Sequence, residues 1–101
     1  MQKSFDLGYY EAIIQIRPAD KDVFGYAIHL IEKRKNVFIS RIESEKFGHD
    51  IYVSDRKYAA AIGKKLKARF AGGQLKISKK LYGYDRQKSK NKYRVVVCFR
   101  K

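Results

Sequence analysis

The chain has 101 residues and a net charge of +14, so it is long enough for one domain with a single modest core and favours an anionic partner. Its 45% hydrophobic content argues against a disordered basic tail, and no apolar run approaches the roughly 20 residues that a membrane span requires. The first residues lack the basic-then-apolar pattern of a secretory signal peptide, which predicts a cytoplasmic protein.

The first half of the sequence reads as a strand, a helix and a hairpin. Alternating apolar residues precede Pro18, and apolar residues at helical spacing follow Asp20 and Asp22, either of which can cap the helix. These patterns predict a strand over residues 9–17, a helix over 22–34, a strand over 37–43, a turn over 45–50 and a short strand over 51–53. In the first strand, one face is expected to carry Tyr10, Ala12, Ile14 and Ile16.

The second half predicts a helix and a hairpin. Ser54 is the expected N-cap of the helix, Asp55 lies in its first turn, and Gly72 and Gly73 end it through a left-handed cap. The apolar stripe of this helix is Tyr58, Ala59, Ile62, Leu66 and Phe70. A strand over residues 75–84, a polar loop over 85–92 and a strand over 93–100 follow. The order β-α-β-β-α-β-β predicts an α+β fold, a two-layer sandwich with both helices on one face of a mostly antiparallel sheet.

The positive charge is confined to one half of the chain. Residues 1–53, the neutral half, carry eight Lys or Arg and eight Asp or Glu. Residues 54–101, the basic half, carry sixteen Lys or Arg and two acids. Solubility does not require this separation of signs, whereas attraction of a polyanion does benefit from it. Nucleic acid is the expected polyanion, and RNA is the favoured form.

The hairpin holds the densest group of candidate contacts. Lysine and arginine neutralise phosphates, and tyrosine rings stack on unpaired bases. The competing interpretation is a soluble loop between two strands. The candidates are Lys79, Lys80, Tyr82, Tyr84, Arg86, Lys88, Lys90, Lys92, Tyr93 and Arg94.

The second helix supplies another basic surface. On a helical wheel, its outer ridge, opposite the apolar stripe, holds Arg56, Lys57, Lys64 and Lys67. A plain solvated face is the alternative, but such faces usually mix in glutamates, and none follows Asp55 in this helix. The ridge is therefore a candidate phosphate contact.

The sheet face turned away from the helices is a third candidate. If Tyr93, Val95, Val97 and Phe99 face the helices, this open face carries Arg94, Val96, Cys98, Arg100, Lys76, Ser78, Lys80, Tyr82 and Tyr84. A face with aromatic and cationic side chains can bind single-stranded RNA, although the glycine and aromatic spacing of the RNA-recognition motif is absent. Alternatively, Val96 and Cys98 are half-buried or meet a partner domain.

The sequence offers no catalytic or metal-binding pattern. The single cysteine, Cys98, excludes an internal disulfide and a multi-cysteine zinc site, and it is expected to be a small apolar filler. His29 and His49 form no metal or catalytic spacing with it. Gly72 and Gly73 lack the Lys-Ser/Thr that would make a phosphate loop. No cofactor, metal or small-molecule substrate is expected.

Three segments carry a family resemblance. Residues 9–17, residues 50–54 with the Ala/Lys-rich helix through Phe70, and residues 81–86 with 93–95 resemble the middle domain of the ribosomal large-subunit export adaptor family, of nonsense-mediated-decay-three type, in its archaeal form. The resemblance covers about residues 8–100. It implies an α+β domain similar to a small large-subunit ribosomal protein, association with the large subunit late in assembly, and no catalytic residues.

The chain departs from the family pattern in two respects. Family members carry Cys-x-x-Cys zinc modules before this domain and a further β-domain after it, whereas this sequence has one cysteine and ends at Lys101. It is therefore expected to be either a free-standing relative or a fragment of a longer protein.

The sequence thus predicts a small RNA-binding module that acts on ribosomal RNA or ribosomal particles. The alternative is a protein-interaction domain that docks its basic half on an acidic partner. A nuclease is disfavoured, because metal-dependent cleavage needs clustered carboxylates and the basic half offers only Asp55 and Asp85.

Overall fold

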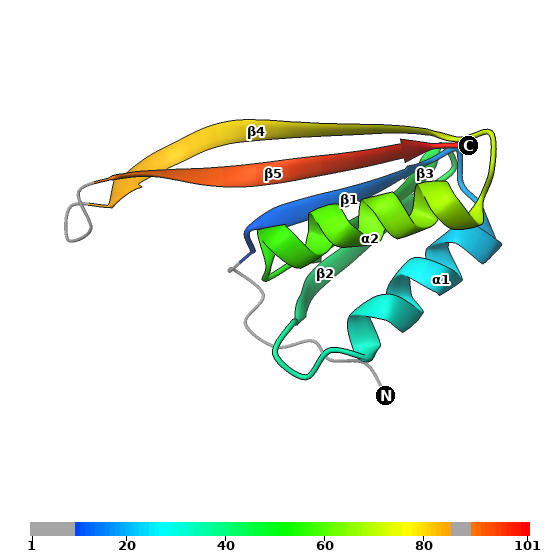
Figure 1. The fold of residues 1–101 in the computed structure, drawn as a ribbon, viewed down its shortest axis with the longest axis horizontal. Helices are drawn as coiled ribbons and strands as arrows, with labels where there is room; N and C mark the ends of the chain where they lie inside the picture. Colours follow the sequence, from blue (N-terminus) through cyan, green and yellow to red (C-terminus); the bar gives the residue numbers. More distant parts are fainter. Residues whose placement is uncertain (1–9, 86–89) are drawn as a thin grey trace.

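The computed structural model describes residues 10–85 and 90–101, with side chains described for positions 10–80 and 93–101. The elements are β1 (Ala12–Arg17), α1 (Lys21–Glu32), β2 (Ile39–Glu45), β3 (Gly48–Val53), α2 (Arg56–Arg69), β4 (Gln74–Asp85) and β5 (Lys90–Arg100). Figure 1 shows both helices on one face of the sheet. The strand order is β2-β3-β1-β5-β4, and only the β1–β5 pair is parallel. The predicted α+β sandwich and its element order are confirmed.

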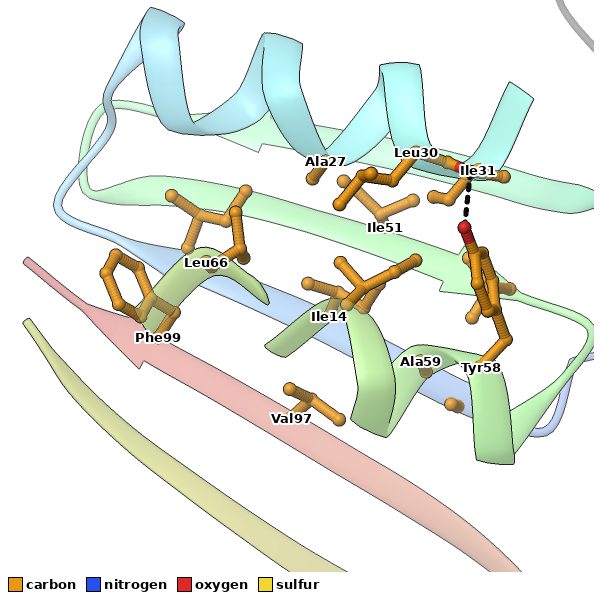
Figure 2. Close-up of a cluster of buried hydrophobic side chains, with 14 of the residues drawn as sticks. Ile14, Ala27, Leu30, Ile31, Ile51, Tyr58, Ala59, Leu66, Val97 and Phe99 are labelled. Carbon is orange, nitrogen blue, oxygen red and sulfur yellow. Dashed lines mark hydrogen bonds between the residues drawn. The ribbon is translucent and has the colours of Figure 1, made fainter. Parts of the chain in front are cut away.

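The core lies between the helices and the three central strands. Alternation along β1 buries Ala12, Ile14 and Ile16 against the helices, and the parallel register places Val97 of β5 beside Ile14. On α2, four residues of the predicted apolar stripe lie on the buried face, with Ile62 and Leu66 fully covered, while the fifth, Phe70, is the half-buried C-cap. Figure 2 shows α1 and α2 side chains meeting above the sheet in this cluster.

The helix caps agree only in part with the predictions. Asp20 caps α1, since its carboxylate accepts hydrogen bonds from the backbone N–H groups of Asp22 and Val23. The expected cap of α2, Ser54, is wrong. Its hydroxyl accepts instead from the Phe38 N–H at 2.8 Å, and the Asp55 carboxylate caps α2 by accepting from Tyr58.

The end of α2 differs from the prediction. The helix ends at Arg69, and its C-cap, Phe70, has a φ of −111°, so the expected left-handed cap at Gly72 and Gly73 is wrong. Gly72, with a φ of +91°, lies in the turn that follows, where the Gly73 N–H donates to the Phe70 carbonyl. The chain can therefore reverse direction directly after the helix and enter β4 at Gln74.

Two hairpins are longer than predicted. β3 begins at Gly48 rather than at residue 51, because the turn after β2 takes only two residues. The expected polar loop over residues 85–92 is also wrong. β4 continues to Asp85 and β5 begins at Lys90, so the register set by the apolar pairs extends into the polar segment and pairs the backbone groups that the two strands turn toward each other. Residues 86–89 lie outside the described part of the chain.

This extension makes a two-stranded ribbon. β5 pairs with β1 only from Val95 onward, so residues 90–94 and their partners on β4 continue past the end of β1. Figure 1 shows the ribbon projecting beyond both helices. A shift in register between Leu81 and Gly83 marks a bulge within it.

Tyr10 does not share the buried face of β1. The strand begins at Ala12 after a bend at Glu11, and the Tyr10 ring packs edge-on against Tyr52, with ring centroids 4.9 Å apart. Tyr52 pairs with Ile13, which points away from the helices. Tyr10 therefore belongs to the open face.

Candidate nucleic-acid interface

The outer ridge of α2 lies where the helical wheel predicts it. Arg56, Lys57, Lys64 and Lys67 are all exposed, opposite the buried Ile62 and Leu66. Lys65, which the sequence reasoning left out, is exposed as well. A helical wheel drawn from the sequence predicts which side chains of α2 point outward, but it does not predict which residues of the sheet lie next to them.

Gly63 fixes how α2 lies on the sheet. A Cβ at this position would come within 2.5 Å of the Val97 side chain and 2.9 Å of the Leu75 side chain, so the helix backbone lies directly on β5 and β4. Arg56 and Lys67 are seven residues before and four residues after Gly63, which places them on the same flank of the helix. This flank of α2 therefore runs along β4.

β4 and β5 add exposed side chains on the same side. Ile77 pairs with Val97 and Lys79 pairs with Val95, so both point toward the helix layer. Ile77 is 39% exposed, and Tyr93, two residues before Val95 on the same side of β5, is 41% exposed. We define the helix–ribbon surface as Arg56, Lys57, Lys64, Lys67, Ile77, Lys79 and Tyr93.

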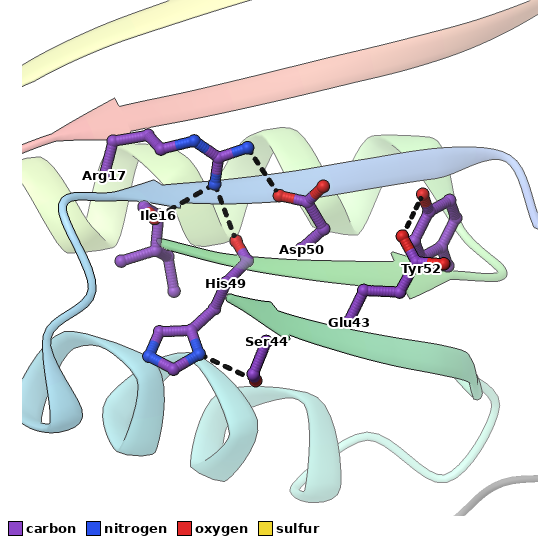
Figure 3. A network of polar contacts seen from close by, with 7 residues as sticks. All are labelled: Ile16, Arg17, Glu43, Ser44, His49, Asp50 and Tyr52. Atoms are coloured by element: carbon purple, nitrogen blue, oxygen red, sulfur yellow. Dashed lines mark hydrogen bonds and ion pairs between the residues drawn. The ribbon is translucent and has the colours of Figure 1, made fainter. Parts of the chain in front are cut away.

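Three acidic residues of the described chain form ion pairs with cations outside α2 and β4. Asp50 pairs with Arg17 at 2.8 Å in the network of Figure 3, and Asp20 pairs with Lys101 at 2.9 Å. Glu43 pairs with Arg41 at 3.5 Å. Among described residues, none of the ion pairs involves a lysine of α2 or β4. These lysines therefore present uncompensated positive charge.

Arg56 is the partial exception on the ridge. Its guanidinium lies 3.7 Å from the Glu11 carboxylate, and its backbone N–H donates to the same oxygen at 3.2 Å. Part of its charge is therefore balanced within the chain, and we expect it to contribute less to anion binding than Lys64 or Lys67 does.

The open face carries the other predicted contacts. The register confirms that Val96, Cys98 and Arg100 point away from the helices. Lys76, Ser78 and Lys80 share that side, because they pair with Cys98, Val96 and Arg94. Lys80 and Arg94 are thus separated from the α2 ridge by the sheet itself.

The guanidinium of Arg94 contacts an aromatic ring on this face. Its guanidinium lies 4.0 Å from the centroid of the Tyr10 ring and donates to the Tyr10 hydroxyl at 3.0 Å. Arg41 lies in the same way over Tyr52, 4.2 Å from that centroid. Tyr52 is buried, which raises its pKa, and its hydroxyl donates to Glu43 at 3.0 Å. These rings are therefore used in packing.

The remaining predicted residues belong to the ribbon. Tyr82, Tyr84, Lys90 and Lys92 lie in β4 and β5, where the backbone pairs Tyr84 with Asn91 and Asp85 with Lys90. Arg86 and Lys88 lie outside the described residues. The structure thus gathers the four α2 residues, places Lys80 and Arg94 on the opposite face, and carries Tyr82, Tyr84, Lys90 and Lys92 outward on the projecting strands.

Comparison with known proteins identifies the family. The model of the NMD3 family, second domain, matches residues 9–100. The chain belongs to the NMD3 family. A search of curated proteins gave no match to it. The NMD3 family is associated with export of the large ribosomal subunit and consists of ribosome-associated adaptors rather than enzymes.

The described part of this NMD3 domain offers neither a metal cluster nor a membrane-spanning helix. In residues 10–85 and 90–101, no group of three or more His, Cys, Asp or Glu side chains comes together as a metal site would require. No helix in the same residues is long and apolar enough to cross a membrane. Of the two histidines, His29 is exposed on α1, while His49 contacts Phe24 and Ser44.

Sequence reasoning missed the apolar part of the helix–ribbon surface. Ile77 reads as an ordinary core position in an alternating strand, and its exposure follows only from the place of β4 at the edge of the sheet. The projecting ribbon was missed for a similar reason. It arises because β4 continues to Asp85 although β1 begins only at Ala12, and this difference is visible only in the assembled sheet. In this NMD3 domain, the candidate interface therefore combines a predictable ridge with an unpredicted edge.

Proposed function

We propose that this NMD3-family domain binds RNA of the large ribosomal subunit through its helix–ribbon surface. The observation that carries the proposal is the set of exposed lysines on α2 and β4 that have no acidic partner among the described residues. Family membership supports the ribosomal setting, and the cytoplasm is the proposed compartment.

Phosphate neutralisation provides most of the binding free energy in this proposal. Lys64, Lys67 and Lys79 approach the nucleic-acid backbone from the helix and from the sheet edge, and each contact releases a counterion. Neutralising about 4 to 6 phosphates gives a slope of log K against log salt of about −3 to −5.

Two less polar side chains add to these contacts. Tyr93 presents an exposed ring on which an unpaired base can stack, and Ile77 offers apolar area for a ribose or a base. Stacking of this kind is tolerant of sequence, so we propose recognition of RNA shape and backbone rather than of a base sequence.

Sedimentation of the protein with purified large ribosomal subunits tests the proposal. We expect the wild-type chain to sediment with large subunits at moderate salt, and the triple variant Lys64→Ala, Lys67→Ala, Lys79→Ala to remain largely in the supernatant. A matched variant removes the same charge from exposed lysines of the neutral half, by Lys21→Ala, Lys35→Ala and Lys46→Ala. Equal loss in the two variants would contradict the assigned surface, and no sedimentation of the wild type would contradict the function.

A further inference from the structure

β4 forms an open edge of the sheet. It pairs with β5 on one side and with no other strand in the described part of the chain. Along this edge, Gln74, Lys76, Ile77, Lys79 and Lys80 are exposed. Every second residue of such an edge directs its backbone N–H and C=O groups outward, where they are free to pair with another strand.

The edge is regular over a useful length. Register is continuous from Gln74, opposite Arg100, to Leu81, opposite Tyr93, and the bulge comes only after Leu81. The opposite edge differs, because β2 has seven residues and an irregularity between Ile39 and Arg41. Bulges discourage the pairing of a further strand, so β2 is the better protected of the two edges.

Between Gln74 and Leu81, β4 has no bulge, and its lysine side chains are what discourages pairing with a second copy of the same strand. Lys76, Lys79 and Lys80 would meet the same lysines in a second copy of this chain and repel them. The same three charges attract an acidic segment, so this protection discriminates between partners. The exposed Ile77 adds an apolar spot that an incoming strand would cover.

We propose that the edge of β4 from Gln74 to Lys80 binds an extended acidic segment of a partner protein by strand addition. The register defines the partner's pattern. Acidic residues lie opposite Lys76 and Lys80 on the open face, and an apolar residue lies beside Ile77 on the helix side. The inference goes beyond RNA binding, since it adds a second partner of a different chemical class.

The edge favours a peptide over RNA for a reason of hydrogen bonding. A peptide strand supplies both N–H donors and C=O acceptors at the strand spacing of about 4.8 Å. RNA phosphates accept hydrogen bonds but donate none, and the donors of RNA, its 2′-hydroxyl and base N–H groups, do not alternate with acceptors in the way that the backbone of a strand does. Strand addition satisfies both kinds of group.

A labelled seven-residue peptide of alternating glutamate and valine tests the proposal by fluorescence anisotropy. Its control is the same sequence with every backbone amide N-methylated, which keeps charge and side chains but removes the donors. We expect the methylated peptide to bind at least about tenfold more weakly, because main-chain hydrogen bonds provide much of the affinity in strand addition. Equal affinity of the two peptides would overturn the proposal.

A charge exchange places the peptide on the edge. The double variant Lys76→Glu, Lys80→Glu is expected to lose the acidic peptide and to gain binding of a peptide of alternating lysine and valine, and this gain shows that the variant is folded. The matched variant Lys64→Glu, Lys67→Glu makes the same charge change on α2 and is expected to keep the acidic peptide. Loss of single-stranded RNA binding, but not of peptide binding, in the β4 variant would assign the edge to RNA and overturn the proposal.

Discussion

The hydroxyl of Tyr58 on α2 donates a 2.7 Å hydrogen bond to the backbone carbonyl of Leu30 near the end of α1. The bond is buried and joins the two helices directly, as Figure 2 shows. Leu30 lies in the last turn of its helix, where carbonyl groups lack intrahelical partners. The bond therefore fixes the rotation of α2 about its axis and directs the Lys64 and Lys67 side of the helix outward.

Tyr58→Phe removes this hydrogen bond while keeping the ring. We expect a loss of about 1 to 3 kcal/mol in the free energy of unfolding, because the Leu30 carbonyl is left buried without its donor. Urea unfolding measures the loss. A variant as stable as the wild type would show that the bond does not tie the helices together.

Leu66→Ala tests the division of α2 into a packed face and a charged face. Leu66 is fully buried, so its truncation should cost about 2 to 5 kcal/mol of unfolding free energy. The neighbouring exposed Lys67→Ala should change stability by no more than about 0.5 kcal/mol. Thermal and chemical unfolding of both variants check the contrast, and similar melting temperatures would show that the orientation of the helix is wrong.

Asp20 links the start of α1 to the last residue of the chain. Its carboxylate caps the helix, and the hydrogen bond from Lys101 is the main cause that holds its pKa below the ordinary value. Asp20→Ala should cost about 0.5 to 2 kcal/mol of unfolding free energy, as expected for a lost N-cap. Asp22→Ala, two residues later in the first turn of α1, is the control and should cost less.

The same carboxylate predicts a pH dependence. Because its pKa is lowered on folding, its charge contributes stability that is present above the pKa of the unfolded chain and is lost as the pH falls through the folded value. Asp20→Asn keeps a capping oxygen but not the charge. We expect the stability difference between wild type and Asp20→Asn to shrink on acidification, as measured by urea unfolding at several pH values. A difference independent of pH would contradict the ion pair.

Cys98→Val should be tolerated. Cys98 is half-buried on the open face beside Gln15, and valine keeps its apolar character and approximate volume, so the cost should stay below about 1.5 kcal/mol. RNA binding should be unchanged, because the side chain points away from the helix–ribbon surface. Loss of binding by a folded variant would instead place the RNA contact on the open face.

Local patterns were sufficient to predict most of the fold. The spacing of apolar residues predicted the buried faces of β1 and α2, and the two glycines predicted a reversal of the chain before β4, because burial and backbone freedom depend on residues close in sequence. The cap of α2 was misplaced by one residue. Ser54 and Asp55 are both good caps, and the choice depends on Phe38, a neighbour from another element that binds Ser54.

The site was less predictable than the fold. The exposure of the α2 lysines follows from a helical wheel, but the position of Arg94 against Tyr10 depends on two segments 84 residues apart in sequence. The ribbon follows from the different lengths of β1 and β5, which no short pattern reveals. Contacts set by register and sheet order therefore required the assembled structure.

The salt dependence of RNA binding tests the central claim most directly. Affinity for a ribosomal RNA fragment is measured across a range of salt concentrations for the wild type and for the variant Lys64→Ala, Lys67→Ala, Lys79→Ala. We predict a wild-type slope of about −3 to −5 in log K against log salt, and a slope smaller in magnitude by about two to three units in the variant. A wild-type affinity that does not change with salt, or identical slopes for the two proteins, would contradict phosphate binding by the helix–ribbon surface.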